Sequence, residues 1–195
     1  MVTIAAKIVK SVVEFSHQLI SQAVHAGSVA VDATAGNGYD TLFLAQSVGA
    51  SGKVFAFDIQ EKAIAHTQRL LKAHGLENRV ELICQGHEKI DEYVPAKVHG
   101  IIFNLGYLPG GDQGVVTNPD TTVTALEKSI HLLTAGGVLA IAVYWGHPGG
   151  PEEKQAVENW VQKLSPRVFD VIKIDFPNKN KAPFLFGVQK KLLEE

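Results

Sequence analysis

Two carboxylates and two glycines gather in one short turn of the sequence and limit what this turn can bind. Asp32 ends a short apolar run, Gly36 and Gly38 follow it, and Asp40 precedes apolar residues 42–45. The pattern predicts a strand, a glycine-rich turn that a ligand can approach closely, and a helix start. Because anions already favour a helix N-terminus, carboxylates here disfavour a phosphate-binding loop. They favour a ligand with a cationic or hydroxyl-rich part.

A third carboxylate, Asp58, ends the next apolar run, 20 residues after Gly38. A carboxylate at this place can accept hydrogen bonds from both ribose hydroxyls of an adenosine group, in NAD or in S-adenosylmethionine (SAM). The dinucleotide pattern G-x-G-x-x-G/A is incomplete, because Thr41 stands at its third small position. Asp40 would also direct negative charge at a pyrophosphate. The sequence therefore predicts SAM as the cofactor, whose ammonium and sulfonium explain the carboxylates of the first turn.

Neighbouring residues extend this predicted adenosine site. Ile59 is placed to pack on adenine, and the turn at residues 85–87 to hydrogen-bond its edge. The alternative for Asp58 is a turn, or a cap of the helix predicted to begin at Glu61. Together with the glycine turn, the carboxylate fits a cofactor better than a cap.

A second polar turn follows a later strand and has the composition needed to hold an amine. Residues 104–112 are Asn-Leu-Gly-Tyr-Leu-Pro-Gly-Gly-Asp. They resemble the Asn-Pro-Pro-Tyr loop of amino-methyltransferases, with Leu105 and Gly106 in place of the prolines. The amide oxygen of Asn104 and the Leu105 carbonyl can accept two N–H bonds while the amine lone pair faces a methyl group. Tyr107 can stack on a planar substrate or close over the cofactor. The alternative is a Gly/Pro turn capped by the asparagine.

An amine must also lose a proton around the transfer. His147, in Gly-His-Pro-Gly-Gly after a fifth strand, and Asp112 are candidate acceptors. Either can instead be a turn residue, and orienting or binding the substrate is the favoured role for His147. The other histidines mostly lie on predicted helices or their ends, where we interpret them as surface residues, and no pair has metal-ligand spacing: His17, His25, His66, His74, His99 and His131.

Length and composition indicate a single domain over residues 1–195, with 46% hydrophobic and 19% charged residues. No apolar run approaches the roughly 18 residues of a membrane span, and the charged N-terminal pattern does not resemble a signal peptide. The net charge of −2 gives no global basic footprint for nucleic acid. The single Cys84, expected in a buried strand, excludes a disulfide framework and indicates a reducing compartment, so we expect a cytoplasmic protein.

Apolar runs alternate with helical patterns along the chain. Amphipathic spacing predicts an N-terminal helix over residues 3–25. The other predicted helices span about 40–48, 61–74, 88–93, 120–134 and 151–164, and the strands about 28–33, 53–59, 79–84, 100–105, 138–144, 168–175 and 184–189. The last two strands have only a short connection and must pair antiparallel. We predict an α/β, Rossmann-like class I methyltransferase fold: a mostly parallel seven-stranded sheet, a C-terminal antiparallel hairpin and helices on both faces.

Three loop motifs together resemble one family of SAM-dependent methyltransferases, whose members are labelled rRNA methylases and include the tRNA 5-(aminomethyl)-2-thiouridine methyltransferases. The motifs are residues 32–41, 104–112 and 146–150, followed by Asn178 and 183–184, and the similarity covers nearly the whole chain. The resemblance implies N-methylation of the aminomethyl group on the wobble uridine of tRNA, giving 5-methylaminomethyl-2-thiouridine. It implies tRNA, through its anticodon arm, as the partner, with a homodimer as an open option.

The motifs and the resemblance together assign residues to roles. The cofactor site is predicted to comprise Asp32, Thr34, Gly36, Asn37, Gly38, Asp40, Thr41, Asp58, Ile59, Gln60, Gly86, His87 and Asn104. The catalytic residues are expected to be Asn104, Leu105, Tyr107 and His147, and the substrate side Tyr107, Asp112, His147, Asn178 and Pro183. Lysines near both ends of the chain would supply a local basic rim for RNA: Lys7, Lys10, Lys179 and Lys181.

Two other functions remain open at this stage. One keeps the cofactor and takes an rRNA base or a small-molecule amine as the acceptor. The other is a non-catalytic protein that binds an adenosyl ligand and associates with RNA. The loop at residues 104–107 argues against the second, because a sensor has no need to hold an amine in line with a methyl group.

Overall fold

Seven strands form one sheet in the computed structural model, which describes residues 9–95, 97–108, 110, 114 and 116–192. The strand order is β3-β2-β1-β4-β5-β7-β6, and β7 runs antiparallel to both of its neighbours. The predicted parallel sheet with a C-terminal antiparallel hairpin is confirmed. The strands are β1 Val29–Asp32, β2 Lys53–Phe57, β3 Val80–Ile83, β4 Val98–Leu105, β5 Leu133–Val143, β6 Phe169–Ile174 and β7 Phe184–Lys190.

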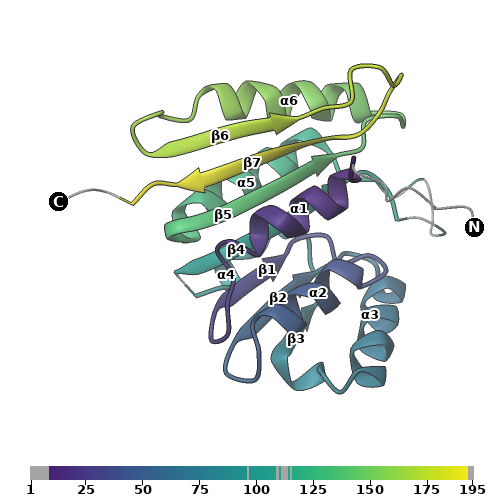
Figure 1. The fold of residues 1–195 in the computed structure, drawn as a ribbon. Helices are drawn as coiled ribbons and strands as arrows, with labels where there is room; N and C mark the ends of the chain where they lie inside the picture. The colour runs from purple at the N-terminus through teal and green to yellow at the C-terminus, as the bar shows by residue number, and fades with distance from the viewer. Residues whose placement is uncertain (1–8, 96, 109, 111–113, 115, 193–195) are drawn as a thin grey trace, which may run out of the picture.

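Helices cover both faces of this sheet (Figure 1). One face carries α1 Val12–Ile20, α2 Tyr39–Ser47 and α3 Glu61–Ala73, and the other carries α4 Ile90–Tyr93, α5 Pro119–Leu132 and α6 Gly150–Gln162. Two short 3₁₀ helices, η1 Glu77–Arg79 and η2 His87–Lys89, complete the connections. None of the helices in the described part of the chain is long and apolar enough to cross a membrane.

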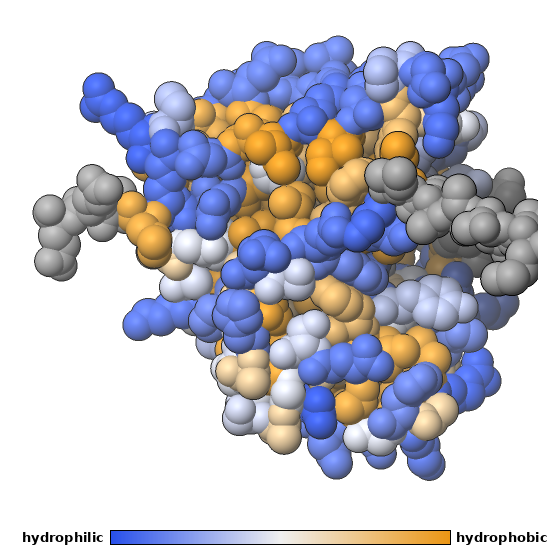
Figure 2. Space-filling view, viewed as in Figure 1, coloured by the Kyte–Doolittle hydropathy of each residue, from blue (hydrophilic) through white to orange (hydrophobic). Residues whose placement is uncertain are grey.

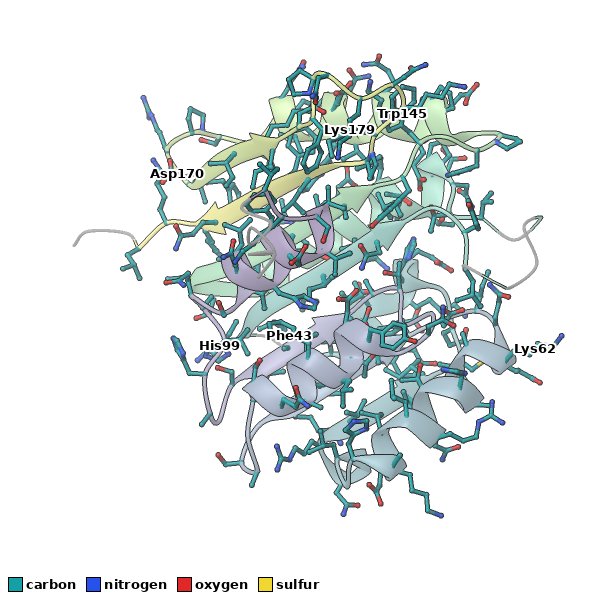
Figure 3. The ribbon with its side chains drawn as sticks, turned by 45° about the vertical axis from the view of Figure 1, so that its right-hand side comes forward. Phe43, Lys62, His99, Trp145, Asp170 and Lys179 are labelled. Atoms are coloured by element: carbon teal, nitrogen blue, oxygen red, sulfur yellow. The ribbon has the colours of Figure 1, made fainter. Side chains whose placement is uncertain are left out.

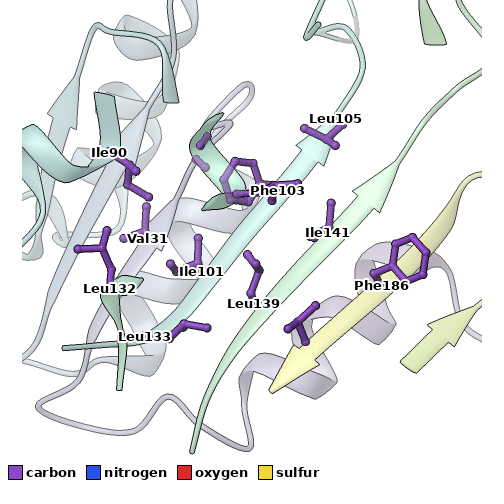
Figure 4. Packing of buried hydrophobic residues seen from close by; sticks show 14 of the residues in the cluster. Val31, Ile90, Ile101, Phe103, Leu105, Leu132, Leu133, Leu139, Ile141 and Phe186 are labelled. Atoms are coloured by element: carbon purple, nitrogen blue, oxygen red, sulfur yellow. The ribbon is translucent and has the colours of Figure 1, made fainter. Parts of the chain in front are cut away.

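The central strands are buried from both sides. Along β4, Ile101, Phe103 and Leu105 point into the cluster formed with α5 and α6 (Figure 4), whereas Ile102 joins the cluster under α1 and α2. This alternation follows from the two-residue repeat of a strand. It explains why β4 is an almost continuous apolar run in the sequence.

The N-terminal helix is shorter than predicted. It begins at Val12 because Ser11 and Glu14 form a capping box, in which each side chain accepts a hydrogen bond from the backbone N–H of the other. It ends at Ile20, and residues 21–23 form turns. The predicted helix was therefore wrong for residues 9–11 and 21–25, and its residues 3–8 lie outside the described part of the chain.

The boundary between α5 and β5 also differs from the prediction. The helix ends at Leu132, and the strand begins at once, so Gly136 and Gly137 lie within β5 and do not close the helix. The pairing with β4 moves from Val98↔Leu133 to Gly100↔Val138, so the register of the two strands shifts between these pairs. Gly136 adopts a φ of 79°, a backbone conformation that glycine tolerates best.

Cys84 is exposed, so the prediction of a thiol buried in a strand was wrong. The physical reason is that β3 ends at Ile83, whose side chain is the last of this strand to enter the core. The Cys84 side chain then points along the surface, with its Sγ 3.9 Å from the Ile59 carbonyl oxygen.

Two strand glycines provide the space in which α1 and the segment after it lie on the sheet. A Cβ atom on Gly100 would lie 2.5 Å from Cγ2 of Val24, and one on Gly187 would lie 2.7 Å from Cδ1 of Leu19. Beyond α1 the sheet is less covered, and Figure 2 shows apolar side chains exposed over β6 and β7. Among them, Ile172 of β6 is 47% exposed.

A methyl group added at Gly100 should destabilise the protein by about 1–3 kcal/mol, because it overlaps Val24 in a packed contact. Urea denaturation of Gly100→Ala measures this. Gly146→Ala is the control, since no atom lies within 4 Å of its Cβ position, and it should stay within about 0.5 kcal/mol of wild type. Equal stabilities of the two variants would contradict the close approach of Val24 to the sheet.

Candidate functional site

A cavity of about 520 Å³ opens at the carboxyl ends of the parallel strands. Its described walls come mainly from the loops that follow β1, β2, β3, β4 and β5. It lies where β1 and β4 are neighbours and the strand order reverses, which is where open α/β sheets bind ligands. The volume is that of a site for a cofactor-sized molecule.

The Asp58 side chain lines the cavity and joins the glycine-rich loop after β1 to the end of β2. Its Oδ2 accepts the Gly36 N–H at 2.9 Å, and its Oδ1 accepts the Gln60 N–H at 2.8 Å. Each carboxylate oxygen has a further lone pair, so both can still accept a hydrogen bond from a ligand hydroxyl. Asp58 therefore forms a turn at Gln60, one of the two alternatives, does not cap α3, and is also available to a ribose.

Asp32 lies beneath the loop and is fully buried. It accepts hydrogen bonds from Thr41 Oγ1 at 2.6 Å and from the Thr34 N–H at 3.1 Å, so it joins the end of β1 to α2. Burial, together with the charge of Asp40, raises the pKa of Asp32 from 3.8 to about 7. Asp32 is absent from the described residues that line the cavity, and its hydrogen bonds hold the loop in place. A cofactor contact of Asp32 stays a prediction.

Gly38 and Thr41 also shape the loop from outside the cavity wall formed by the described residues. Gly38 caps α2 with a φ of 81°, and a Cβ there would lie 2.8 Å from Oγ1 of Thr67. Only glycine combines this conformation with such a close approach. A cofactor contact of either residue stays a prediction.

The predicted adenosine side of the cavity combines an apolar surface with a neutral imidazole. Ile59 is 58% exposed beside Gln60 and Gly86. His87 is buried against the ring of Phe103, with 5.5 Å between centroids, and burial lowers its pKa below the ordinary 6.5. Its Nε2 is buried without a hydrogen-bond partner among the described residues, so it is a polar group that a ligand can satisfy.

The side chain of Asn104 is oriented by Asp40. Its backbone N–H donates to Thr34 Oγ1 at 2.8 Å, and its Nδ2 donates to Oδ2 of Asp40. A carboxylate can only accept, so the amide must turn its NH₂ toward Asp40 and its oxygen away. That oxygen, Oδ1, is buried and has no hydrogen-bond partner in the described part of the structure. The cavity thus presents an acceptor to an N–H group of a ligand.

The loop after β4 is closed at its base by Thr117. The Gly106 N–H donates to Thr117 Oγ1 at 2.8 Å, and the Thr117 N–H donates to the Gly106 carbonyl at 2.9 Å. Glu153 of α6, which is 1% exposed, accepts from Thr117 and Thr122, each at 2.7 Å. Tyr107, which lies next in this loop, lines the cavity and is 44% exposed.

Twelve of the predicted site residues line the cavity: Thr34, Gly36, Asn37, Asp40, Asp58, Ile59, Gln60, Gly86, His87, Asn104, Leu105 and Tyr107. Others that line it were not predicted: Val13, Tyr39, Val116, Thr117, Asn118, Thr121 and Tyr144. Most of these belong to α1, the start of α5 and the segment before it, which no motif connects to the site. Glu153 had a sequence signal, because a charge at this position interrupts the buried stripe of Val157 and Trp160.

His147, Asn178 and Pro183 do not line the cavity formed by the described residues, and Asp112 lies outside those residues. His147 is nevertheless adjacent to the loop that follows β4, residues 104–117, which we name the acceptor loop. Its ring meets Tyr107 edge to face with 6.1 Å between centroids, and its Nε2 is buried without a partner in the described structure. Trp145, in the same loop after β5 as His147, donates its Nε1–H to the Ala182 carbonyl at 2.9 Å. This bond joins the loop after β5 to the β6–β7 connection.

His17 is a correction to the sequence analysis, which interpreted it as a surface residue. Its Nε2 forms a hydrogen bond with Oδ1 of Asp40, and its ring stacks on Phe43 of α2 with 3.8 Å between centroids. The physical reason is that α1 packs on β4, β5 and β7 and thereby brings His17 beside α2, a proximity that periodicity does not reveal.

Comparison with known proteins identifies the family. Residues 54–189 match the family model described as "Putative rRNA methylase". A curated relative from Arabidopsis thaliana, "tRNA (mnm(5)s(2)U34)-methyltransferase, chloroplastic", is 39% identical over 192 residues, which cover 93% of this chain and 70% of the relative. The chain belongs to this methylase family. The family predicted from the loop motifs is thereby confirmed.

Solved structures agree with this membership. One from Clostridium thermocellum, with the same rRNA methylase description, is 43% identical with a TM-score of 0.92, and the match covers 94% of this chain and 100% of that one. Another, a "putative methyltransferase" from Streptococcus mutans in complex with SAH, is 42% identical with a TM-score of 0.86, covering 94% and 99%. The class I methyltransferase fold and the enzyme class predicted from the sequence are confirmed.

The buried Asp32 should make stability fall as pH rises. Its native pKa of about 7 exceeds the ordinary 3.8, so between these values the native state binds more protons than the unfolded state. Asp32→Asn stays neutral and can still accept from Thr41, so its free energy of unfolding should fall less over this range than that of wild type. Urea denaturation across the range measures the two slopes.

The control for this titration is the exposed Asp175, whose replacement by asparagine should leave the wild-type slope unchanged. If Asp32→Asn instead shows the wild-type slope, the carboxyl group is ionised in the native state throughout this range.

Proposed function

We propose that the protein is a SAM-dependent N-methyltransferase that converts 5-aminomethyl-2-thiouridine at the wobble position of tRNA into 5-methylaminomethyl-2-thiouridine. The observation that carries the proposal is the buried Oδ1 of Asn104, which has no hydrogen-bond partner among the described residues and lies beside a cavity suited to an adenosyl group. An oxygen held in this way is suited to accept an N–H bond of an amine. The description of the Arabidopsis relative as a tRNA methyltransferase supports the choice of substrate.

The residues present fit SAM as the cofactor. Asp58 would accept hydrogen bonds from the ribose hydroxyls, Ile59 would pack on adenine, and Asp40 would place a negative charge near the methionine ammonium. When bound, SAM supplies the methyl group, which passes to the amine nitrogen as the C–S bond breaks and leaves its electrons on sulfur. The relative that is in complex with SAH supports this choice of cofactor.

The chain itself positions the amine. Asn104 Oδ1 would accept one N–H bond and the Leu105 carbonyl another, so that the lone pair of the nitrogen faces the methyl group. The Leu105 carbonyl already accepts the Tyr144 N–H at 2.9 Å, and its second lone pair remains for the substrate. Tyr107, exposed at the cavity rim, would stack on the planar base.

A proton must leave the nitrogen around the transfer. His147 is a candidate acceptor because it lies against Tyr107 at the rim of the acceptor loop. Its Nε2, which is buried and has no partner in the part of the chain that the structure describes, fits either proton transfer or a hydrogen bond that orients the substrate.

The surface for the anticodon arm would lie at the same end of the sheet. Lys179, on the β6–β7 connection beside the loop that carries Trp145 (Figure 3), packs over the ring of Phe176 at 4.7 Å. Lys181 lies on the same connection, and Lys10 precedes α1. Because the net charge is only −2, RNA binding would depend on such local lysines and on a homodimer surface. A cytoplasmic location stays a prediction, since the Arabidopsis relative is described as chloroplastic.

Mass spectrometry of tRNA nucleosides tests the function. Purified protein and SAM are incubated with tRNA that carries 5-aminomethyl-2-thiouridine, and the digest should contain the nucleoside one methyl group heavier. Parallel reactions with unmodified rRNA and with small-molecule amines test the other acceptors. Methylation of either in the absence of tRNA methylation would overturn the assigned substrate. Calorimetric binding of NADH without binding of SAM would overturn the cofactor.

Removing the orienting amide should separate catalysis from cofactor binding. Asn104→Ala should lower turnover by roughly 10²-fold or more while leaving SAM affinity roughly intact, because it removes the contact to the acceptor and the hydrogen bond to Asp40 but keeps the carboxylates of Asp40 and Asp58. Asp58→Ala should instead weaken SAM binding by roughly 1–3 kcal/mol, the loss expected for hydrogen bonds to a charged group. Steady-state kinetics and calorimetry measure both effects. Wild-type turnover in Asn104→Ala would mean that this loop does not hold the acceptor.

A further inference from the structure

A single carboxylate joins helix α1 to the acceptor amide. Oδ1 of Asp40 is hydrogen-bonded to Nε2 of His17, and Oδ2 of Asp40 accepts from Nδ2 of Asn104. The His17 and Asp40 side chains are 26% and 12% exposed. Hydrogen bonds to an ionised carboxylate are among the stronger ones, and partial burial limits competition from water. His17, absent from every sequence motif, is therefore two hydrogen bonds from the oxygen proposed to hold the amine.

His17 is itself held in place from two directions. Its ring stacks on Phe43 with an interplanar angle of 5°, and Figure 3 shows Phe43 on α2 under the N-terminal helix. The helix that carries it is capped by Ser11 and anchored in the core by Ile20, which is fully buried. The Nε2–H group thus reaches Asp40 from a rigid support.

The orientation of the Asn104 amide depends on where the Asp40 carboxylate points. With His17 on Oδ1, the second oxygen faces Nδ2 and keeps the amide oxygen free. Without this donor, the Asp40 side chain can adopt other rotamers. The Asn104 amide then loses the carboxylate that determines which way its NH₂ and its oxygen point. A flipped amide would present NH₂ to the N–H groups of an amine, a donor facing a donor.

We propose that His17 is a positioning residue for methyl transfer: through Asp40, it sets the orientation in which Asn104 accepts an N–H bond from the substrate. The inference rests on the proposed function, because it assumes that Asn104 holds the acceptor amine. It adds a residue of α1 to a site whose motifs all lie in the loops after the strands.

Two substitutions separate hydrogen bonding from packing. His17→Phe keeps an aromatic ring for Phe43 but has no donor for Asp40, whereas His17→Gln keeps a donor and loses the stacked ring. We expect about a tenfold or greater fall in kcat for His17→Phe and a smaller fall for His17→Gln. Because Asp40 also faces the cofactor side, the KM for SAM in His17→Phe should rise, but by less than kcat falls. The exposed His131, at the end of α5, gives the control His131→Ala, which should match wild type.

Two results would overturn the proposal: wild-type kcat in His17→Phe, or a larger loss in His17→Gln than in His17→Phe, since the second result assigns His17 to packing. The double variant His17→Phe/Asn104→Ala should be no slower than Asn104→Ala alone, because the two residues act through one amide. An additive loss would also contradict the role.

A structural readout keeps this test independent of the substrate. In protein with ¹⁵N-labelled asparagine, the Nδ2 proton resonances of Asn104, assigned by their loss in Asn104→Ala, should shift in His17→Phe and stay near wild type in His17→Gln. Unchanged resonances in His17→Phe would overturn the positioning role. Absence of methyl transfer by the wild-type protein would instead overturn the proposed function, while the resonances still decide whether His17 orients the amide.

Discussion

The pairing of β1 with β4 is the constraint on which the rest of the site depends. These strands are neighbours with Asp32 opposite Ile102, and just beyond that register Thr34 and Asn104, 70 positions apart in sequence, share a hydrogen bond. The chain leaves β1 for a helix on one face and leaves β4 toward a helix on the other, so the two loops separate and open the cavity. The loop suited to the donor and the loop suited to the acceptor meet only because of this pairing.

Buried carboxylates stabilise the loops around this cavity, although burial of charge is costly in itself. Glu153 offsets that cost with two threonine hydroxyls, and Asp32 offsets it with a hydroxyl and a backbone N–H. The charge of Asp40 works against ionisation of Asp32, which leaves this end of the sheet electrostatically unfavourable for any further anion. A cationic ligand would be attracted to the same carboxylates. The composition of the glycine-rich loop led to the same preference for a cation.

Most of the fold was predictable because the spacing of apolar residues within each segment indicates a helix or a strand. Strands such as β2 and β4 are short apolar runs, and the glycines and polar residues that follow them mark the loops of the site. The boundaries that were predicted wrongly have other local causes. The capping box of Ser11 and Glu14 starts α1 at Val12, and a shift of register between β4 and β5 places Gly136 and Gly137 inside a strand. Neither feature changes the average pattern of its segment.

Predictability ended where the site depends on helix packing. His17 differs from the histidines predicted to lie on the surface because the placement of α1 on the sheet brings it beside α2, and its partner Asp40 is 23 positions away. Asp32 matched the motif for a ligand contact, yet its burial follows from Thr41 reaching back to it from the helix. Side-chain type and spacing identified the loops of the site. Which carboxylate holds a loop and which faces the cavity could be seen only in the three-dimensional structure.

The closed base of the acceptor loop has a consequence for how such an enzyme can diversify. The chain leaves at Gly106 and returns at Thr117, and these two residues are fastened to each other and to Glu153 on a separate helix. Tyr107 and Leu108 still line the cavity, whereas a change of length in residues 109–115 would leave this closure in place. Evolution can therefore change this part of the loop to suit a new acceptor while the loops suited to the methyl donor stay the same.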